Sequence, residues 1–310
     1  MRIRATVAAV SGALALSALA VPAAHAAGPS THRADAAKIF QAVHAPSTAK
    51  AGIKASVAGD DDMPYDLGVT FSNLKVAKAL KVGTTNRVST TITYTMKFGA
   101  DVDVRAEDFF TEAYLYKGSF DRPQNELSSE DLARCSVTSE TAATCKIKID
   151  IYPADGDLDN IDAGTWRAGA YAVALNGQDP MSRDFDLSQV GYAEKGALGT
   201  TLVQRNSKLT TSGKPKPVKK GKTVTVTGKL TRANWESGTY SVYKGQAVKL
   251  QFKKKGTTTY KTLKTVKANS AGTFKTTTKA TADGYYRFVF AGNSTTPAVN
   301  AAGDLVRVKK

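Results

Sequence analysis

Histidine is almost absent from this chain of 310 residues, and its three occurrences, His25, His32 and His44, all lie near the N-terminus. None falls in the part of the sequence that is patterned as strand. Histidine supplies the general base of hydrolytic triads and is a frequent zinc ligand. We therefore expect no imidazole-based catalysis and no histidine-containing zinc site in the folded domains, and we predict that the protein is not an enzyme.

Cysteine is equally scarce, because only Cys135 and Cys145 occur. A bridge between them is the default in an oxidising compartment, and closing so short a loop would remove roughly 3 kcal/mol of unfolded-state entropy. Two free thiols, or a bridge to another chain, are the alternatives. A bridged cysteine offers no thiolate, so a cysteine nucleophile is not expected. Paired carboxylates could hydrolyse glycosides, but the acids of the first half are predicted to lie in solvated turns.

Long apolar runs are missing except at the N-terminus, where Arg2 and Arg4 precede the apolar residues 5–21. The following Ala24-His25-Ala26 has the small residues that a signal peptidase reads. We predict a signal peptide over residues 1–26, with a membrane anchor as the alternative. No later segment is predicted to span a membrane, so we expect a secreted, extracellular protein that can associate with the cell wall.

Acidic residues are rare after residue 205. Residues 206–310 contain 22 lysines and arginines against Glu236, Asp283 and Asp304, whereas residues 27–205 carry a net charge of −5. A strongly basic domain favours anionic partners, and we expect anionic cell-wall polymers or polysaccharide rather than specific recognition of nucleic acid. A solvated face that only keeps edge strands apart is the alternative. The candidate anion-binding residues, on the polar face of one strand and the turn after it, are Lys249, Lys253, Lys254 and Lys255.

Residues 27–62 are rich in Ala, Ser, Thr, Gly and Lys and are predicted to form a flexible linker or pro-segment. A short amphipathic helix over residues 34–43 fits the pattern, with Ile39, Phe40 and Val43 on one side. It is too short to be stable alone, so it would need a surface to pack against.

Beyond residue 62 the sequence alternates between apolar and polar residues with a period of two, which indicates half-buried strands. The clearest example runs from Val88 to Phe98, and further examples cover residues 145–151, 224–230 and 248–253. Turn residues separate these segments at the spacing typical of a sandwich. We predict an all-β chain with two β-sandwich domains, residues 63–205 and 206–310.

A family resemblance is carried by Asp283-Gly284-Tyr285-Tyr286-Arg287-Phe288, which is similar to the tyrosine corner of immunoglobulin-like sandwiches. Gly164-Thr165-Trp166-Arg167 is its counterpart in the first half, with Trp in place of Tyr. With the signal peptide and the Ala, Thr and Lys bias, the chain resembles tandem immunoglobulin-like secreted proteins of the actinobacterial, streptomycete-like type. The resemblance implies the fold and a hydroxyl bond from Tyr286 to upstream backbone, and it says little about activity.

Alternate carboxylates in one acidic turn form a candidate calcium site, because a hard cation prefers oxygen ligands. The turn departs from a helix-loop-helix calcium loop, since Asn160 replaces the usual Gly and Trp166 replaces the bidentate Glu. An ordinary Asp-rich turn is the alternative. The candidate ligands are Asp155, Asp157, Asp159 and Asp162.

Three aromatic residues near one turn, Trp235, Tyr240 and Tyr243, form a candidate carbohydrate-stacking site if they are exposed together. Filling one end of the sandwich core is the alternative. The sequence thus predicts a monomeric, secreted, non-catalytic protein that acts by surface contact, with calcium or carbohydrate binding as the alternative function.

Overall fold

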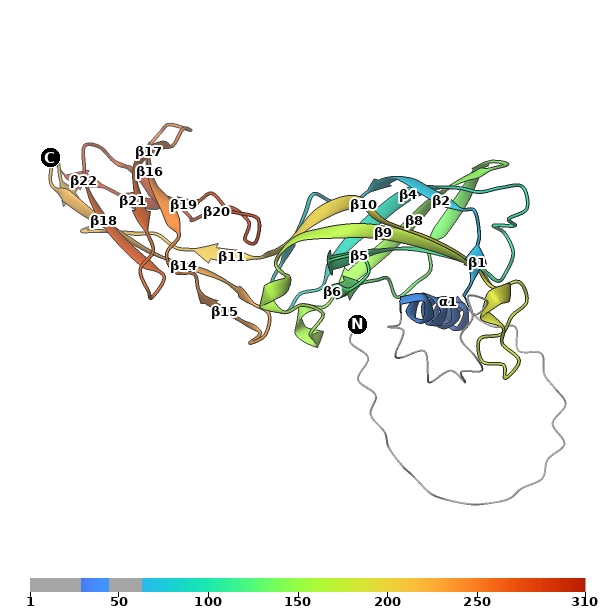
Figure 1. Ribbon diagram of the computed structural model, residues 1–310. Coiled ribbons are helices and arrows are strands. Elements are labelled where there is room, and N and C mark those ends of the chain that lie inside the picture. The colour runs from blue at the N-terminus through green and yellow to red at the C-terminus, as the bar shows by residue number, and fades with distance from the viewer. Residues whose placement is uncertain (1–28, 45–62, 310) are drawn as a thin grey trace, which may run out of the picture. The chain divides into compact units, whose positions relative to one another are not determined.

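The computed structural model describes residues 29–44 and 63–309, with side chains placed from Ala34 onward. Within these residues the chain forms one α-helix, three short 3-10 turns and 22 strands (Figure 1). The predicted all-β, immunoglobulin-like fold is confirmed, because antiparallel sheets with buried inner faces account for nearly all of the regular structure. The predicted signal peptide lies outside the described residues.

Strands between residues 65 and 205 form two sheets, in which β10 pairs in parallel with both β1 and β3. The pairs β2–β4, β5–β6, β5–β9 and β7–β8 are antiparallel. The first sheet contains β1 (Tyr65–Asp66), β10 (Gly191–Arg205), β9 (Gly164–Ala174), β5 (Phe109–Gly118) and β6 (Pro123–Leu127), with β3 (Ala79–Val82) beside β10. The second contains β2 (Thr70–Lys75), β4 (Val88–Lys97), β8 (Ala142–Ile151) and β7 (Arg134–Ser139).

The alternation predicted from the sequence is confirmed in β4 and β8. In β4, Ile92, Tyr94 and Met96 are buried, whereas Thr91 and Lys97 are exposed. The inward side chains of β8 are likewise buried at every second position. The disulfide between Cys135 and Cys145 is present and joins directly opposite residues of β7 and β8.

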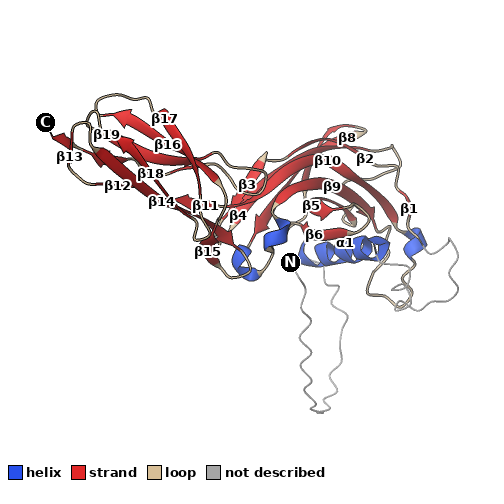
Figure 2. Ribbon diagram, turned by 60° about the vertical axis from the view of Figure 1, so that its left-hand side comes forward, coloured by secondary structure: helices blue, strands red, loops and turns tan. Residues whose placement is uncertain are grey.

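Strand β5 departs from this simple alternation, because almost all of its residues are buried on both faces of the sheet. The helix α1 (Pro29–His44) packs against it, and Figure 2 shows the helix alongside β5 and β6. Ala36 and Ile39 are fully buried there, and the Phe40 ring centroid lies 4.8 Å from that of Tyr171. The helix predicted over residues 34–43 is therefore present, and residues 29–44 are a packed element rather than part of a flexible linker. The sheet supplies the packing surface that so short a helix needs.

The strands after residue 206 form a second sandwich. One layer consists of β11 (Ser207–Leu209), β12 (Ser212–Lys214), β14 (Thr223–Asn234), β15 (Thr239–Val242) and β18 (Thr273–Lys279). The other consists of β16 (Ala247–Lys254), β17 (Lys261–Lys267), β19 (Gly284–Phe290), β20 (Val299–Asn300) and β21 (Asp304–Val306). A small parallel pair joins β13 (Val218–Lys219) to β22 (Val308–Lys309).

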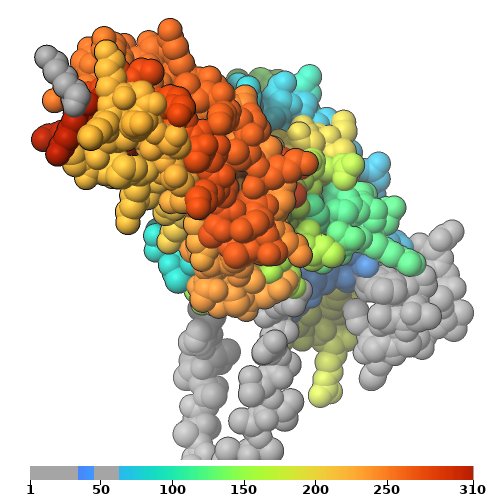
Figure 3. Space-filling model, turned by 90° about the vertical axis from the view of Figure 1, so that its left-hand side faces the viewer, coloured from blue at the N-terminus to red at the C-terminus, as the bar shows by residue number. Residues whose placement is uncertain are grey.

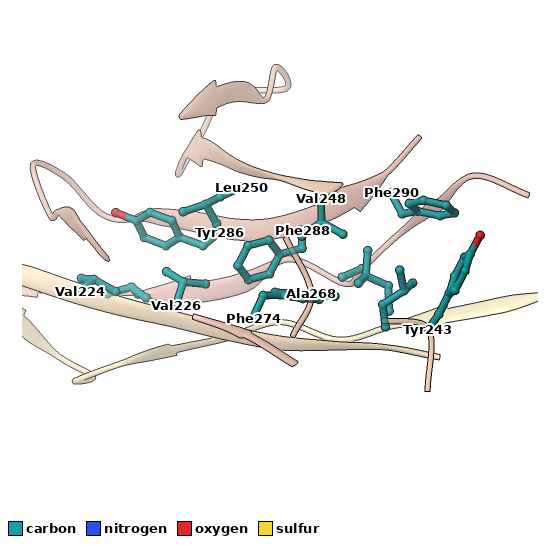
Figure 4. Close-up of a cluster of buried hydrophobic side chains, with 14 of the residues drawn as sticks. Val224, Val226, Tyr243, Val248, Leu250, Ala268, Phe274, Tyr286, Phe288 and Phe290 are labelled. Carbon is teal, nitrogen blue, oxygen red and sulfur yellow. The ribbon is translucent and has the colours of Figure 1, made fainter. Parts of the chain in front are cut away.

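The core of this second sandwich lies between its two layers, where inward side chains from both meet (Figure 4). Phe274 from one layer and Phe288 from the other pack edge to face, with ring centroids 4.4 Å apart. Outward residues of the same strands lie at the surface (orange to red in Figure 3). Aliphatic and aromatic residues at alternate positions of two facing sheets produce such a core without any helix.

The chain divides into two compact units whose limits do not follow the chain order. Among the described residues, the first unit comprises 29–44 and 63–76 together with Ser89–Asp150 and Arg167–Gly199. The second comprises Ala77–Val88, Ile151–Trp166 and residues 200–309. The domain limits predicted from the sequence, 63–205 and 206–310, stay a prediction.

The tyrosine-corner expectation is corrected for Tyr286. In the described part of the chain its hydroxyl forms no hydrogen bond, and its ring is buried in the core of the second sandwich. The bond to upstream backbone is instead made by Trp166, whose indole Nε1 donates to the carbonyl oxygen of Asp162 at 2.7 Å. The indole Nε1 of Trp166 thus makes the bond to upstream backbone that the hydroxyl of Tyr286, its sequence counterpart, does not make.

No helix among residues 29–44 and 63–309 has the length and hydrophobicity needed to cross a membrane.

Candidate functional site

A basic face covers β16 and β19 in the second unit. Along β19, half-buried Tyr285 and Arg287 alternate with the buried Tyr286 and Phe288, so the first two point outward. The outward positions of the neighbouring β16 carry Lys249, Gln251 and Lys253, and the turn after it carries exposed Lys255. The period-two pattern of two paired strands thus gathers cations on one surface.

Almost none of the cations in the second sandwich has an acidic partner. Among the described residues 206–309, the only ion pair joins Lys216 to Asp304. The same Asp304 also accepts a hydrogen bond from the backbone amide of Gly213. Asp283 accepts one from the amide of Val308 at 2.7 Å, and Glu236 accepts one from the amide of Asn160. The positive charge predicted from the sequence is therefore exposed and uncompensated within this sandwich.

Of the predicted lysines, Lys249, Lys253 and Lys255 lie on or beside this basic face, whereas Lys254 has the parity of the inward Val248 and Leu250 and lies at the end of β16. Lys249, Lys254 and Lys255 are exposed, and Lys253 is half-buried between two tyrosine rings. Their role in binding anions remains a proposal.

The predicted aromatic stacking trio does not form an exposed surface. Trp235 and Tyr243 are buried, and only Tyr240 is partly exposed. The Trp235 indole donates to the carbonyl oxygen of Gly83 at 2.9 Å, and Tyr243 packs against Phe290 in the core. This corrects the carbohydrate-stacking hypothesis for these residues, because their rings serve packing within the second unit.

The acidic turn uses its carboxylates for local hydrogen bonds. Asp157 accepts a bond from the amide of Tyr152 at 2.7 Å, and the buried Asp162 accepts one from the amide of Asp159 at 2.8 Å. In residues 29–44 and 63–309, no three His, Cys, Asp or Glu side chains come together as a group that could hold a metal ion. Asp155 is exposed at the 3-10 turn Pro153–Asp155. Calcium binding by this turn stays a prediction.

A cluster of carboxylates and tyrosines in the first unit was not predicted. Glu112 on β5 is 3% exposed, and it accepts hydrogen bonds from the Tyr171 hydroxyl at 2.8 Å and the Ser129 amide at 3.1 Å. On β10, Glu194 accepts a bond from the Tyr114 hydroxyl. These acids do not lie in solvated turns, which corrects the expectation for the first half of the chain.

His44, at the C-terminal end of α1, joins this cluster. Its Nε2 lies 2.8 Å from Glu194 Oε2, and the hydrogen bond to Glu194 raises the pKa of the imidazole. The expectation that no histidine enters a folded domain is thus wrong, because α1 carries His44 onto the sheet. The imidazole holds the C-terminal end of α1 in place. When it is protonated, its positive charge also interacts favourably with the negative end of the helix dipole.

Burial shifts the other titratable groups of the cluster. It raises the pKa of Glu126 on β6 to about 7, and the charge of Glu112 adds to the effect. Burial raises the pKa of Tyr114, and the nearby charge of Glu194 adds to the shift. Burial likewise raises the pKa of Tyr171, with an added effect from the charge of Glu112. The cluster is therefore sensitive to pH near neutrality through Glu126 and His44.

The sequence contained a signal for this cluster. Phe110, Glu112, Tyr114 and Tyr116 occupy one face of β5 at a period of two, which places a carboxylate within an aromatic row. A charged residue in such a row predicts a buried acid with polar partners. The identity of those partners, the Tyr171 hydroxyl and the Ser129 amide, depended on tertiary contacts that no local pattern gives.

Two surface hollows lie away from this cluster. One, of about 510 Å³, is lined in the first unit by residues that include Asp101, Asp103 and Glu140. The other, of about 630 Å³, lies in the second unit and is lined mainly by hydroxyl and lysine side chains, among them Thr210, Thr273 and Lys267. Neither contains an imidazole or a thiol.

Comparison with known proteins gives no family for this chain. No protein family model matches it, and no curated protein matches it. Among solved structures it is similar to the adhesin InvE of Yersinia pseudotuberculosis, with 12% identity, a TM-score of 0.25, and coverage of 80% of this chain and 61% of the adhesin.

Two further structures are similar at the same level. The full ectodomain (Ig1–Ig3) of mouse nectin-like molecule 4 has 11% identity and a TM-score of 0.22, with 76% of this chain and 65% of that chain covered. The ligand-binding domain of human OSCAR has 10% identity and a TM-score of 0.22, with 75% and 95% covered. The chain thus spans less than two thirds of the adhesin and of the nectin-like ectodomain, and likenesses at this level carry no argument about function.

Proposed function

We propose that this protein is a non-catalytic binding protein that attaches to anionic polymers outside the cell through the basic face of its second unit. The observation that carries the proposal is the exposed positive charge of residues 206–309, which has a single acidic ion-pair partner within the described chain. Uncompensated cations on a rigid sheet attract a repeating anion strongly, because no internal pair must be broken before binding.

Two further observations support an extracellular binding role. The disulfide between Cys135 and Cys145 is typical of proteins that fold in an oxidising compartment. The imidazole of His44, which lies outside the basic unit, already bonds to Glu194 within the packing of α1. A surface that binds by contact needs neither a nucleophile nor a general base.

The test is sedimentation of the full mature chain with isolated bacterial cell wall over a series of sodium chloride concentrations. Binding that depends on charge should weaken by about tenfold or more between 0.05 and 0.3 M salt, because the salt screens exposed charges. Binding that does not change with salt would contradict the proposal.

A matched pair of variants assigns the binding to the basic unit. The substitution of Lys249, Lys254 and Lys255 by glutamine should weaken binding at 0.1 M salt by about tenfold. The control replaces three exposed lysines of the first unit, Lys75, Lys97 and Lys146, by glutamine and removes the same total charge. Equal losses in the two variants would show that net charge alone, and not the basic face, determines attachment.

A further inference from the structure

Two cations on the basic face are held against aromatic rings. The guanidinium carbon of Arg287 lies 3.7 Å from the centroid of the Tyr260 ring. Lys253 Nζ lies 5.1 Å from the ring centroids of both Tyr260 and Tyr285. A cation at these distances from a ring face is attracted by the ring quadrupole and loses conformational freedom before any ligand arrives. We call these four residues the cation platform.

Strand pairing and one hydrogen bond fix the positions of the two cations. Lys253 of β16 lies directly opposite Tyr285 of β19, and Gln251 lies opposite Arg287. Arg287 Nε donates to Gln251 Oε1 at 3.0 Å. The guanidinium is therefore anchored through one edge and one face, and its terminal N–H groups remain as donors for a planar anion.

A glycine permits the approach of Tyr260 to this face. A Cβ atom on Gly303 would lie 2.4 Å from the Tyr260 hydroxyl and 3.3 Å from the Cβ of Tyr285. A Cβ atom at position 303 would therefore require the Tyr260 hydroxyl to shift from its present position. The absence of a side chain at Gly303 thus leaves room for Tyr260 beside Tyr285.

The platform lacks an acidic partner inside the described part of this sandwich. The three acids of residues 206–310 have other partners: Asp283 holds the Val308 amide, Asp304 holds Lys216 and the Gly213 amide, and Glu236 holds the Asn160 amide. A guanidinium and an ammonium preorganised side by side, with no internal carboxylate, are complementary in charge to an external anion.

We infer that the cation platform, formed by Lys253, Tyr260, Tyr285 and Arg287, binds an acidic polysaccharide whose sugar rings carry carboxylates. The inference rests on the proposed function and names its ligand class. The planar donors of Arg287 match a carboxylate in a bidentate arrangement. The exposed parts of the two half-buried tyrosine rings, beside the cations, give the apolar contact that the CH face of a sugar requires, which a flexible polyanion without rings would not use.

Three probes separate the features of the ligand, using the full mature chain at 0.15 M salt. Polygalacturonate has both the ring and the charge, polyglutamate has the carboxylates without the sugar ring, and dextran has the ring without the charge. We expect polygalacturonate to bind about tenfold more tightly than polyglutamate of the same charge, and dextran not to bind. Equal affinity for the two polyanions would overturn the inference.

A pair of double variants locates the site. The replacement of Lys253 and Arg287 by glutamine should weaken polygalacturonate binding by about tenfold or more. The control replaces the exposed Lys229 and Lys279, on the other layer of the same sandwich, by glutamine and should change binding by less than about threefold. Melting curves of all variants establish that each is folded.

A third variant changes the platform without changing any charge. Gly303→Ala should displace Tyr260 and weaken polygalacturonate binding by about fivefold, while binding to polyglutamate should be unchanged. If the two double variants lose affinity equally, or if Gly303→Ala binds as the wild type does, the platform is not the site, although the proposed function would stand. If the wild type binds no anionic probe even at low salt, the proposed function fails with it.

Discussion

Trp166→Ala is expected to lower the free energy of unfolding of the second unit by about 4 kcal/mol, because truncation of a fully buried large aromatic residue typically costs 3–5 kcal/mol. Trp166 has no exposed surface and is among the largest fully buried side chains of the described chain. Its indole also donates to the carbonyl of Asp162, which is 3% exposed, at 2.7 Å. The substitution removes both the ring and the partner of that carbonyl.

Urea unfolding monitored by tryptophan fluorescence measures this loss. The chain has two tryptophans, Trp166 and Trp235, and both belong to the second unit, so the remaining Trp235 reports the unfolding of the same unit in the variant. Trp166→Phe keeps most of the bulk and should cost about 2 kcal/mol less than alanine. As a control, alanine at Leu263, which is 40% exposed, should cost less than about 1 kcal/mol. A loss below about 1 kcal/mol for Trp166→Ala would show that the turn before β9 does not depend on the indole.

Glu126→Gln is expected to stabilise the first unit at pH 8 by about 2 kcal/mol and to reduce its dependence on pH. Burial raises the pKa of Glu126 from 4.5 to about 7, so the folded state keeps a proton on this carboxyl that the unfolded state releases. Stability from this group is therefore fully present below about pH 4.5 and is lost as the pH rises through about 7. A shift of this size corresponds to about 3 kcal/mol, and partial exposure reduces it.

The pH dependence of His44 has the same sign. Its pKa is raised in the folded state by the bond to Glu194, so its contribution is present in mild acid and is lost as the pH rises past the raised pKa. Wild-type protein should thus hold α1 more firmly at pH 5 than at pH 8. In Glu126→Gln most of this dependence should be lost, and the part that comes from the bond between His44 and Glu194 should remain.

Hydrogen exchange of the β5 and β9 amides at pH 5 and pH 8, corrected for intrinsic rates, reports the stability of the first unit. Trp166 lies in β9, which continues into the first unit at Arg167, so fluorescence does not isolate the first unit from the second. The exposed Glu130, replaced by glutamine, is the control and should leave the pH dependence unchanged. Identical pH dependence in Glu126→Gln and the wild type would show that the carboxyl is not buried as the structure has it.

The strands could be predicted where their burial is one-sided. In β4 and β16 the buried and exposed residues alternate along the sequence itself, so the pattern of Ile92, Tyr94 and Met96 already indicates an inward face. The bridge between Cys135 and Cys145 was predictable for a similar reason, since two cysteines in a chain predicted to be exported leave few alternatives. Each of these features is encoded within about ten consecutive residues.

The features that escaped prediction depend on contacts between residues far apart in the chain. Trp235 looked like a surface aromatic beside a turn, but its indole bonds to the carbonyl of Gly83. His44 looked like a linker residue, but it lies against Glu194, 150 residues further along the chain. A local pattern gives no information about which distant backbone or carboxylate such a side chain will meet.

Amino-acid composition predicted the basic domain but only part of the cation platform. The excess of lysine after residue 205 predicted an anion-binding domain, and Lys253 was among the residues chosen for it. Arg287, Tyr260 and Gly303 were not chosen, because their association with Lys253 arises from the pairing of β16 with β19 and from the loop that carries Tyr260. The number of charges could be counted from the sequence. The contacts that hold Lys253 and Arg287 against the tyrosine rings could be found only from the three-dimensional structure.

Chemical-shift mapping of the isotope-labelled full chain during titration with oligogalacturonate locates the anion-binding surface. We expect the amides that shift most to lie on β16 and β19 and next to Tyr260, and the shifts to decrease as salt is added. Largest shifts on α1 and β5 of the first unit, or small shifts spread evenly over both units, would contradict it.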